Sequence, residues 1–180
     1  MCLISSIQWN RRGIMEQFFT KLKRGMIFLL SWIAAILLVA MSFLVIYQVF
    51  TRYVLNSPSD FTEEIVRYLL IWTGFMGAAY GFCTRQHMAL LLLHNKMTPE
   101  KRRLLMIFID VLIFAFALAI LTVGGAKLAV SARKEFSALL GISRSLVYSM
   151  APISGVFIMV AQLINIWEDV TGITIKEEDR

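Results

Sequence analysis

Histidine and cysteine, the side chains most often used for metal binding and nucleophilic catalysis, are few and isolated in this sequence. The cysteines Cys2 and Cys83 form no C-x-x-C pair, and the histidines His87 and His94 lie in or beside one polar connection. Thiol–disulfide exchange needs paired cysteines, and a haem-binding bundle needs histidines that face each other from different helices. Metal binding by the two histidines is the weaker alternative to an ordinary loop role. The sequence therefore predicts no enzyme, no metal site and no cofactor in this chain.

A second pattern combines charges with glycines along one apolar segment. It consists of two acids, an arginine and three glycines: Glu63, Glu64, Arg67, Gly74, Gly77 and Gly81. On a helix, acids four and three residues before an arginine can pair with it. Positions spaced by seven fall on nearly one line, and small residues spaced by four let helix backbones approach closely in lipid. This face either packs against the chain's own helices or docks onto a second membrane protein.

Three other polar residues lie within or at the edge of apolar segments, and we expect them to be buried polar groups: Gln48, Arg52 and Asp110. Asp110 lies seven residues beyond Arg103, and an ionisable group inside a membrane helix is costly unless it is paired or hydrated. We expect a partner such as Arg103, or a contact with another subunit; a proton or ion site is the alternative. Gln48 and Arg52, one turn apart, also suit an anchoring role at the headgroup level.

These residues must be positioned by helices that cross a membrane. The chain is 58% hydrophobic and 17% charged, with a mean hydropathy of +0.71, whereas a soluble domain of this length would need more polar surface. A bilayer core is spanned by about 20 apolar helical residues. We therefore predict an all-α membrane protein whose transmembrane domain, residues 25–167, has four transmembrane helices, at about 25–51, 63–84, 104–130 and 145–167.

The flanking segments and the basic residues predict the orientation. Residues 1–24 are predicted to be a cytoplasmic arm that contains an amphipathic helix lying on an anionic membrane face. The alternative is a disordered basic leader. Residues 168–180 read as a polar cytoplasmic tail. Twelve of the 18 lysines and arginines lie in the arm, the tail and the loop between the second and third helices. The positive-inside rule then places both termini in the cytoplasm. The net charge of +6 is thus a topology signal, and no nucleic-acid partner is expected.

Several short motifs occur in a recognisable order: Arg52-Tyr53-Val54-Leu55-Asn56, Pro58, Phe61-Thr62-Glu63-Glu64-Ile65-Val66-Arg67-Tyr68, Trp72, Phe75-Met76-Gly77-Ala78-Ala79, Arg85-Gln86-His87-Met88, and Tyr148 with Pro152-Ile153-Ser154-Gly155. In motif order and span count the chain resembles, from Met26 to Trp167, the small membrane subunit of TRAP (tripartite ATP-independent periplasmic) transporters of bacteria, of the DctQ/SiaQ type. Two features depart from that family: Phe61 replaces a frequent tryptophan, and the stretch 89–93 lacks an aspartate that commonly follows the histidine.

The resemblance implies a division of labour among three proteins of the bacterial inner membrane and periplasm. A periplasmic substrate-binding protein captures an organic acid, such as a sialic acid or a dicarboxylate, and a large membrane subunit imports it by sodium symport, with the sodium ions bound in that partner. This chain would be a small scaffold subunit, in contact with membrane lipids. The alternative is a self-sufficient, oligomeric four-helix transporter or channel with Asp110 as its coupling group.

The same resemblance suggests which residues meet each partner. We expect the large subunit to contact the second helix at Glu63, Glu64, Arg67, Gly74, Gly77 and Gly81. We expect the periplasmic protein to contact the outward-facing loops at Asn56, Asp60, Arg133, Lys134 and Arg144.

Overall fold

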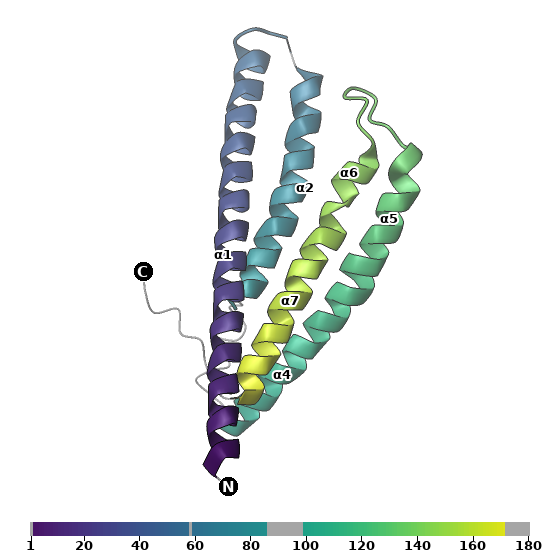
Figure 1. The fold of residues 1–180 in the computed structure, drawn as a ribbon. Helices are drawn as coiled ribbons and strands as arrows, with labels where there is room; N and C mark the ends of the chain where they lie inside the picture. Colours follow the sequence, from purple (N-terminus) through teal and green to yellow (C-terminus); the bar gives the residue numbers. More distant parts are fainter. Residues whose placement is uncertain (1, 58, 86–98, 172–180) are drawn as a thin grey trace.

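The structure, a computed structural model, describes residues 2–57, 59–85 and 99–171, without the side chains of residues 2–16, 99, 100 and 102. Its helices are α1 (Cys2–Tyr53), α2 (Asp60–Cys83), α4 (Pro99–Phe116), the π-helix η1 (Ala117–Gly124), α5 (Gly125–Ser131), the 3-10 turn η2 (Ala132–Lys134), α6 (Arg144–Tyr148) and α7 (Met150–Thr171) (Figure 1). Outside them, the described residues contain one isolated bridge, between Phe136 and Ser143.

Four of these helical stretches are long and apolar enough to cross a membrane: Gln17–Tyr53, Asp60–Cys83, Arg103–Lys134 and Arg144–Thr171. Each overlaps one of the four segments predicted from the sequence. The third stretch joins α4, η1, α5 and η2 without interruption, and α4 begins at Pro99, where a proline is favoured because the first helical N–H has no partner within the helix. The all-α class with four membrane-crossing helices is confirmed.

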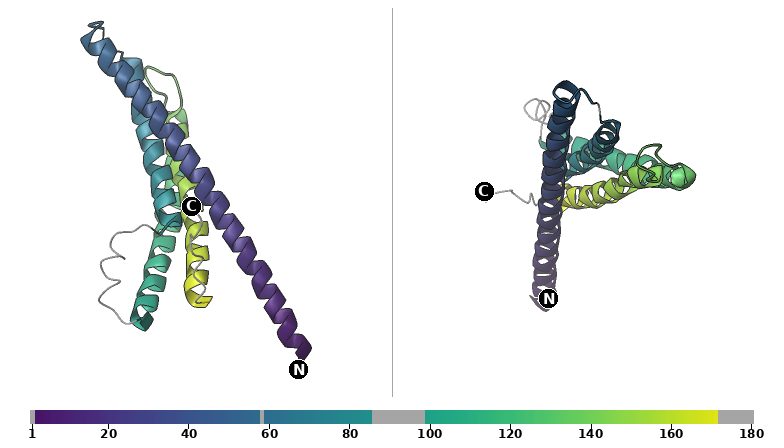
Figure 2. Two further views of the ribbon diagram at one scale, coloured as in Figure 1. Left: turned by 90° about the vertical axis from the view of Figure 1, so that its left-hand side faces the viewer. Right: turned by 90° about the horizontal axis from the view of Figure 1, so that it is seen from above.

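The four spans form two hairpins that meet along α7. One hairpin joins α1 to α2, the other joins the α4–η1–α5 stretch to α6 and α7, and α7 packs on α2, on α4 and on η1 (Figures 1 and 2). Nine residues of α7 are buried, more than in any other helix of the described chain, so the core follows this helix. Both hairpin turns lie at one end of the bundle, while α1 and α4 begin and α7 ends at the other.

α1 is one unbroken helix of 52 residues. At 1.5 Å per residue it is about 78 Å long, far more than the roughly 30 Å of a bilayer core, so it must tilt or project beyond the membrane. The amphipathic segment expected before Gly25 is helical, but no break separates it from the first span. Phe19 in this segment contacts Trp167 of α7, with ring centroids 4.9 Å apart, so this part of α1 packs on the bundle.

A close backbone approach joins the third and fourth spans. A Cβ atom added to Gly155 would lie 2.7 Å from Thr122 Oγ1 and 2.9 Å from Leu121 Cβ, both in η1. The wider π-helical turns are supported by Thr122, whose hydroxyl donates to the carbonyl of Ala117, five residues earlier, at 3.0 Å. Glycine at position 155 is therefore a packing requirement at the centre of the bundle.

Two helix boundaries show how local chemistry interrupts the apolar segments. Pro152 has no N–H to donate to the carbonyl of Tyr148, and the helix is broken there, between α6 and α7 at Ser149. Ser59 is the N-cap of α2, without a side-chain capping bond, and Asp60 is the first helical residue. The Thr62 amide and hydroxyl instead both bond to the Ser59 carbonyl.

Candidate functional sites: the outward face of α2 and a buried polar network

The charge cluster at the N-terminal end of α2 has two separate partnerships. Arg67 pairs with Glu63 at 3.1 Å, and both side chains are more than half exposed. Glu64 instead accepts a hydrogen bond from the Tyr68 hydroxyl. Of the two acids expected to pair with Arg67, only Glu63 forms an ion pair with it, while Glu64 bonds to Tyr68.

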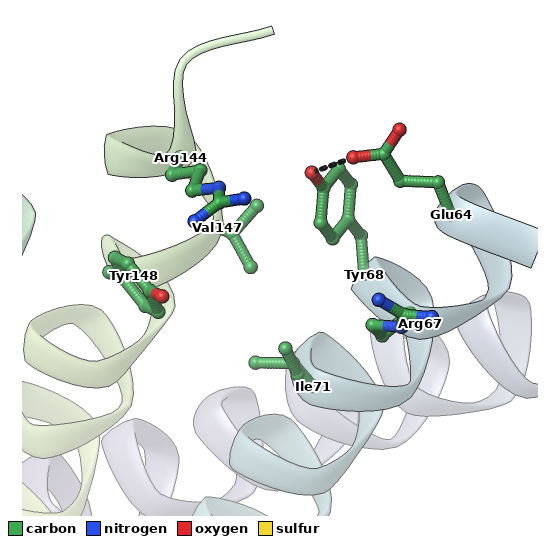
Figure 3. A pocket seen from close by; sticks show the side chains of 7 residues that line it. All are labelled: Glu64, Arg67, Tyr68, Ile71, Arg144, Val147 and Tyr148. Carbon is green, nitrogen blue, oxygen red and sulfur yellow. Dashed lines mark hydrogen bonds between the residues drawn. The ribbon is translucent and has the colours of Figure 1, made fainter. Parts of the chain in front are cut away.

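A pocket of about 240 Å³ lies between α2 and α6 at this level (Figure 3). Its lining residues come from both hairpins: Glu64, Arg67, Tyr68, Ile71, Arg144, Val147 and Tyr148. Arg67 and Arg144 were expected to meet different partner proteins, yet they line the same pocket. Ile71 and Val147 contribute apolar side chains to its lining. The two predicted contact regions are therefore continuous in space.

Below this pocket, α2 presents its glycines away from the rest of the chain. Gly74 and Gly77 are exposed, and a Cβ atom added to either one or to Gly81 would meet no atom within 4 Å. The opposite face carries the buried residues of α2, among them Met76 and Ala79. The sequence left open whether the glycines pack against the chain's own helices or face a second protein. In the described structure they do not pack against the chain's own helices. The glycine line faces outward on the same side as Glu63 and Arg67.

The residues expected to touch a periplasmic protein lie at the end of the bundle that carries both hairpin turns. All five are exposed: Asn56, Asp60, Arg133, Lys134 and Arg144. Arg144 makes a long ion pair with Glu135, at 3.7 Å between Nη1 and Oε2. The structure thus leaves these side chains accessible to another molecule.

At the opposite end, a buried polar network joins all four spans. Lys23 of α1 donates to both carboxylate oxygens of Glu168, at 2.9 and 3.1 Å, and to the Asn165 side chain at 3.2 Å. Lys23, Asn165 and Glu168 are each at most 9% exposed. The Asn165 amide in turn donates to the carbonyl of Phe82 in α2, at 3.5 Å.

Arg85, two residues beyond the end of α2, is the second cation of this network. Its guanidinium donates to both carboxylate oxygens of Asp169, at 3.0 and 3.2 Å, and to Asp110 at 3.4 Å. It also bonds to the Asn165 carbonyl. Two-oxygen contacts between arginine and a carboxylate fix direction as well as charge. Lys23 and Arg85 therefore hold α1, α2, α4 and α7 together at one level.

Two expectations about buried polar groups need correction. Asp110 is buried as expected, but its partner is Arg85 and not Arg103, which instead donates to the carbonyl of Val170. Gln48 is half-buried and Arg52 is exposed. Arg52 lies in the last turn of α1, on a side of the helix that is exposed although the adjacent Thr51 is buried.

Most members of the buried network were not singled out from the sequence. Lys23 and Glu168 were assigned to the arm and the tail, yet α1 and α7 continue through them. A usable signal was present: Glu168 and Asp169 follow Asn165 at spacings of three and four on an otherwise apolar helix. Such spacing places them on one face, where buried polar groups need partners.

Among the described residues, no three histidine, cysteine or acidic side chains are placed to hold a metal ion. His87 and His94 lie outside the described residues. The described chain is a helical membrane protein: a four-helix bundle with buried ion pairs at one end and an uncovered glycine face on α2.

Comparison with known proteins agrees with this class. The family model of the tripartite ATP-independent periplasmic transporters, DctQ component, matches residues 41–172. A protein of Haemophilus influenzae (strain Rd), provisionally named a TRAP transporter small permease protein, is 31% identical over 132 residues, covering 72% of this chain and 81% of the relative. The sialic acid TRAP transporter small permease protein SiaQ of Vibrio cholerae is 31% identical over 134 residues, covering 73% and 75%.

A third relative is much longer than this chain. The sialic acid TRAP transporter permease protein SiaT of Haemophilus influenzae (strain 86-028NP) is 26% identical over 139 residues, which are 75% of this chain but 22% of SiaT. From the family match and these relatives, the chain belongs to the DctQ family and is a small permease subunit of TRAP type, a component of a transport system.

Proposed function

We propose that this chain is the scaffold subunit of a secondary-active TRAP transporter, packing through the outward face of α2 against a large membrane subunit. The observation that carries the proposal is the uncovered line of Gly74, Gly77 and Gly81, continued by the Glu63–Arg67 pair. Small residues let a partner helix approach closely, and an ion pair at the end of the line gives that approach a register. The resemblance of one stretch of the longer permease SiaT to this chain supports a pairing of the two kinds of subunit.

The proposed cargo is an organic acid, of the sialic acid or dicarboxylate type, imported into the cytoplasm by sodium symport. The names of two relatives, SiaQ and SiaT, support this substrate class, and the sodium ions would be bound by the large subunit. The exposed loop residues at the outer end, including Arg133, Lys134 and Arg144, would help receive a periplasmic binding protein. The basic residues near the other end support an inner-membrane orientation with both termini in the cytoplasm.

Reconstitution into vesicles tests this division of labour. Vesicles that contain the chain alone should take up no sialic acid or dicarboxylate, whereas vesicles with the large subunit and the binding protein should do so when a sodium gradient is imposed. Uptake by the chain alone would overturn the scaffold role. It would favour instead the alternative, an oligomeric four-helix transporter with Asp110 as its coupling group. The ion pair between Asp110 and Arg85 argues against this alternative.

A further inference from the structure

Arg85 occupies a backbone position that usually belongs to glycine. α2 ends at Cys83 with Thr84 as its C-cap, so Arg85 is the first residue beyond the cap, and its φ is +52°. Helices often end on a residue in this left-handed conformation, and glycine is favoured there because a Cβ atom is disfavoured in it. An arginine at this position indicates that its side chain serves a purpose that glycine could not.

The left-handed turn changes where the Arg85 side chain goes. Arg85 lies four residues after Gly81, so an uninterrupted helix would place it on the outward line of α2. Instead the guanidinium reaches inward, to Asp169 of α7 and Asp110 of α4. A residue that an uninterrupted helix would point away from the bundle therefore joins α2 to the second hairpin, beside the bond from Asn165 to the Phe82 carbonyl.

The fully buried side chains of α2 have little shape that would fix the rotation of the helix about its own axis, although Tyr80 and Phe82 pack half-buried against the core. The buried residues of α2 are Thr62, Met76, Ala79 and Cys83, which are small or flexible. Between helices in lipid the hydrophobic effect gives no preference, so packing and polar contacts decide which face turns outward. A rotation by one residue, about 100°, would replace the glycine line by bulky side chains.

We propose that Arg85 is the positioning residue that sets the rotation of α2 and thereby presents the glycine line and the Glu63–Arg67 pair outward. The inference rests on the proposed function only in naming the large subunit as what meets that face. The rotation is a property of this chain alone. Asn165, which bonds to both Lys23 and the Phe82 carbonyl, supports the same end of the helix.

The test measures the rotation in the full chain, reconstituted without partners. Nitroxide labels on single cysteines at positions 70, 74, 76, 77 and 79, with Cys2→Ser and Cys83→Ala, report lipid exposure through collisions with dissolved oxygen. Positions 70, 74 and 77 should be exposed, and positions 76 and 79 protected. Arg85→Gln should move the exposure maximum around the helix by one residue or more. Arg24→Gln, which removes an exposed arginine at the same end, should leave the pattern unchanged.

An unchanged pattern in Arg85→Gln overturns the proposal. If Arg85→Gln loses the periodic exposure pattern altogether, Arg85→Lys is the deciding variant, because lysine keeps the charge but lacks the two parallel donors of the guanidinium. A shifted exposure maximum in Arg85→Lys supports the role of Arg85, and an unshifted maximum overturns it. Co-purification with the large subunit separates the two claims. A shifted pattern with an unchanged yield of the complex supports the positioning role of Arg85 and overturns the α2 interface. An unshifted pattern with a reduced yield overturns the positioning role and supports the interface.

Discussion

Lys23, near the start of the first membrane-crossing stretch, and Glu168, near the end of the last, form a buried ion pair 2.9 Å long. The two residues are 145 positions apart, and their side chains are 11% and 3% exposed. Removing one member of such a pair leaves the other as an uncompensated charge in surroundings of low polarity. This pair therefore joins α1 to α7 at one end of the bundle through a buried charge interaction, in addition to apolar packing.

Glu168→Gln should destabilise the chain strongly. The amide can still accept one hydrogen bond from Lys23, but the ammonium loses its counter-charge, so we expect a loss on the order of 3 kcal/mol in the free energy of unfolding. Denaturant titration in mixed micelles measures it. Glu135→Gln is the matched control, since Glu135 is exposed and its ion pair with Arg144 is long, and exposed pairs contribute little. Equal losses in both variants would contradict a special role for Glu168.

Gly155→Ala and Gly74→Ala should have opposite effects on the isolated chain. At position 155 the new methyl group would lie 2.7 Å from Thr122 Oγ1, which forces η1 away and costs about 1–3 kcal/mol. At position 74 no atom lies within 4 Å, and alanine is favoured over glycine in a helix by up to about 1 kcal/mol. Thermal unfolding in detergent checks the signs. A loss of stability in Gly74→Ala would mean that the glycine line is covered within the chain.

The sequence predicted the spans well because hydropathy and helix length are local properties. The second span was expected at 63–84 and is found at Asp60–Cys83. The same local rules failed where distant residues decide the outcome. Glu168 reads as the start of a polar tail, since nothing nearby in the sequence reveals that Lys23 will neutralise it. The turn at Arg85 was equally hidden, because an arginine is rare in a position that favours glycine.

The sequence predicted which residues share one face of α2, but not which way that face points. Spacing alone placed Arg67, Gly74 and Gly81 on one line, and the structure confirms that they share a face. Spacing could not decide whether that face turns inward or outward, since this depends on how α2 sits against α1 and α7. The pocket that brings Arg67 near Arg144 was beyond reach for the same reason: its two walls belong to different hairpins.

Gly77→Leu should separate folding from assembly. An added Cβ atom at this position meets no atom within 4 Å in the isolated chain, and leucine favours the helix over glycine, so the isolated variant should unfold at no lower temperature than the wild type. Against a large-subunit helix packed on the glycine line, the same side chain would hold the backbones apart. We expect at least a tenfold lower yield of the complex in co-purification, equivalent to about 1.4 kcal/mol. Gly25→Leu, which is also unobstructed in this chain but lies on α1, is the control, and a normal yield for Gly77→Leu would argue against this interface.

Arg67→Leu should weaken co-purification with the large subunit while leaving the fold intact. The Glu63–Arg67 pair is more than half exposed and so contributes little to stability on its own. Covered by a partner, Glu63 would lose its counter-charge next to lipid, which is costly. Because Glu64 bonds to Tyr68, only one acid is left unpaired. Glu63→Gln combined with Arg67→Leu should recover part of the yield, and unchanged yield and transport in Arg67→Leu alone would exclude a role for this pair.

Asp110→Asn distinguishes a structural acid from a coupling group. Asp110 lies at 3.4 Å from Arg85, which also binds Asp169 through two oxygens, so the network retains its main contact when the Asp110 charge is removed. An asparagine can still accept a hydrogen bond from the guanidinium. We therefore expect the complex with the large subunit to assemble and to transport at a rate within about threefold of the wild type, a change of less than 1 kcal/mol in the activation barrier. If Asp110 instead carried the coupling ion or proton, the substitution would abolish gradient-driven uptake while binding of the substrate persisted, and the division of labour between the two membrane subunits would have to be abandoned.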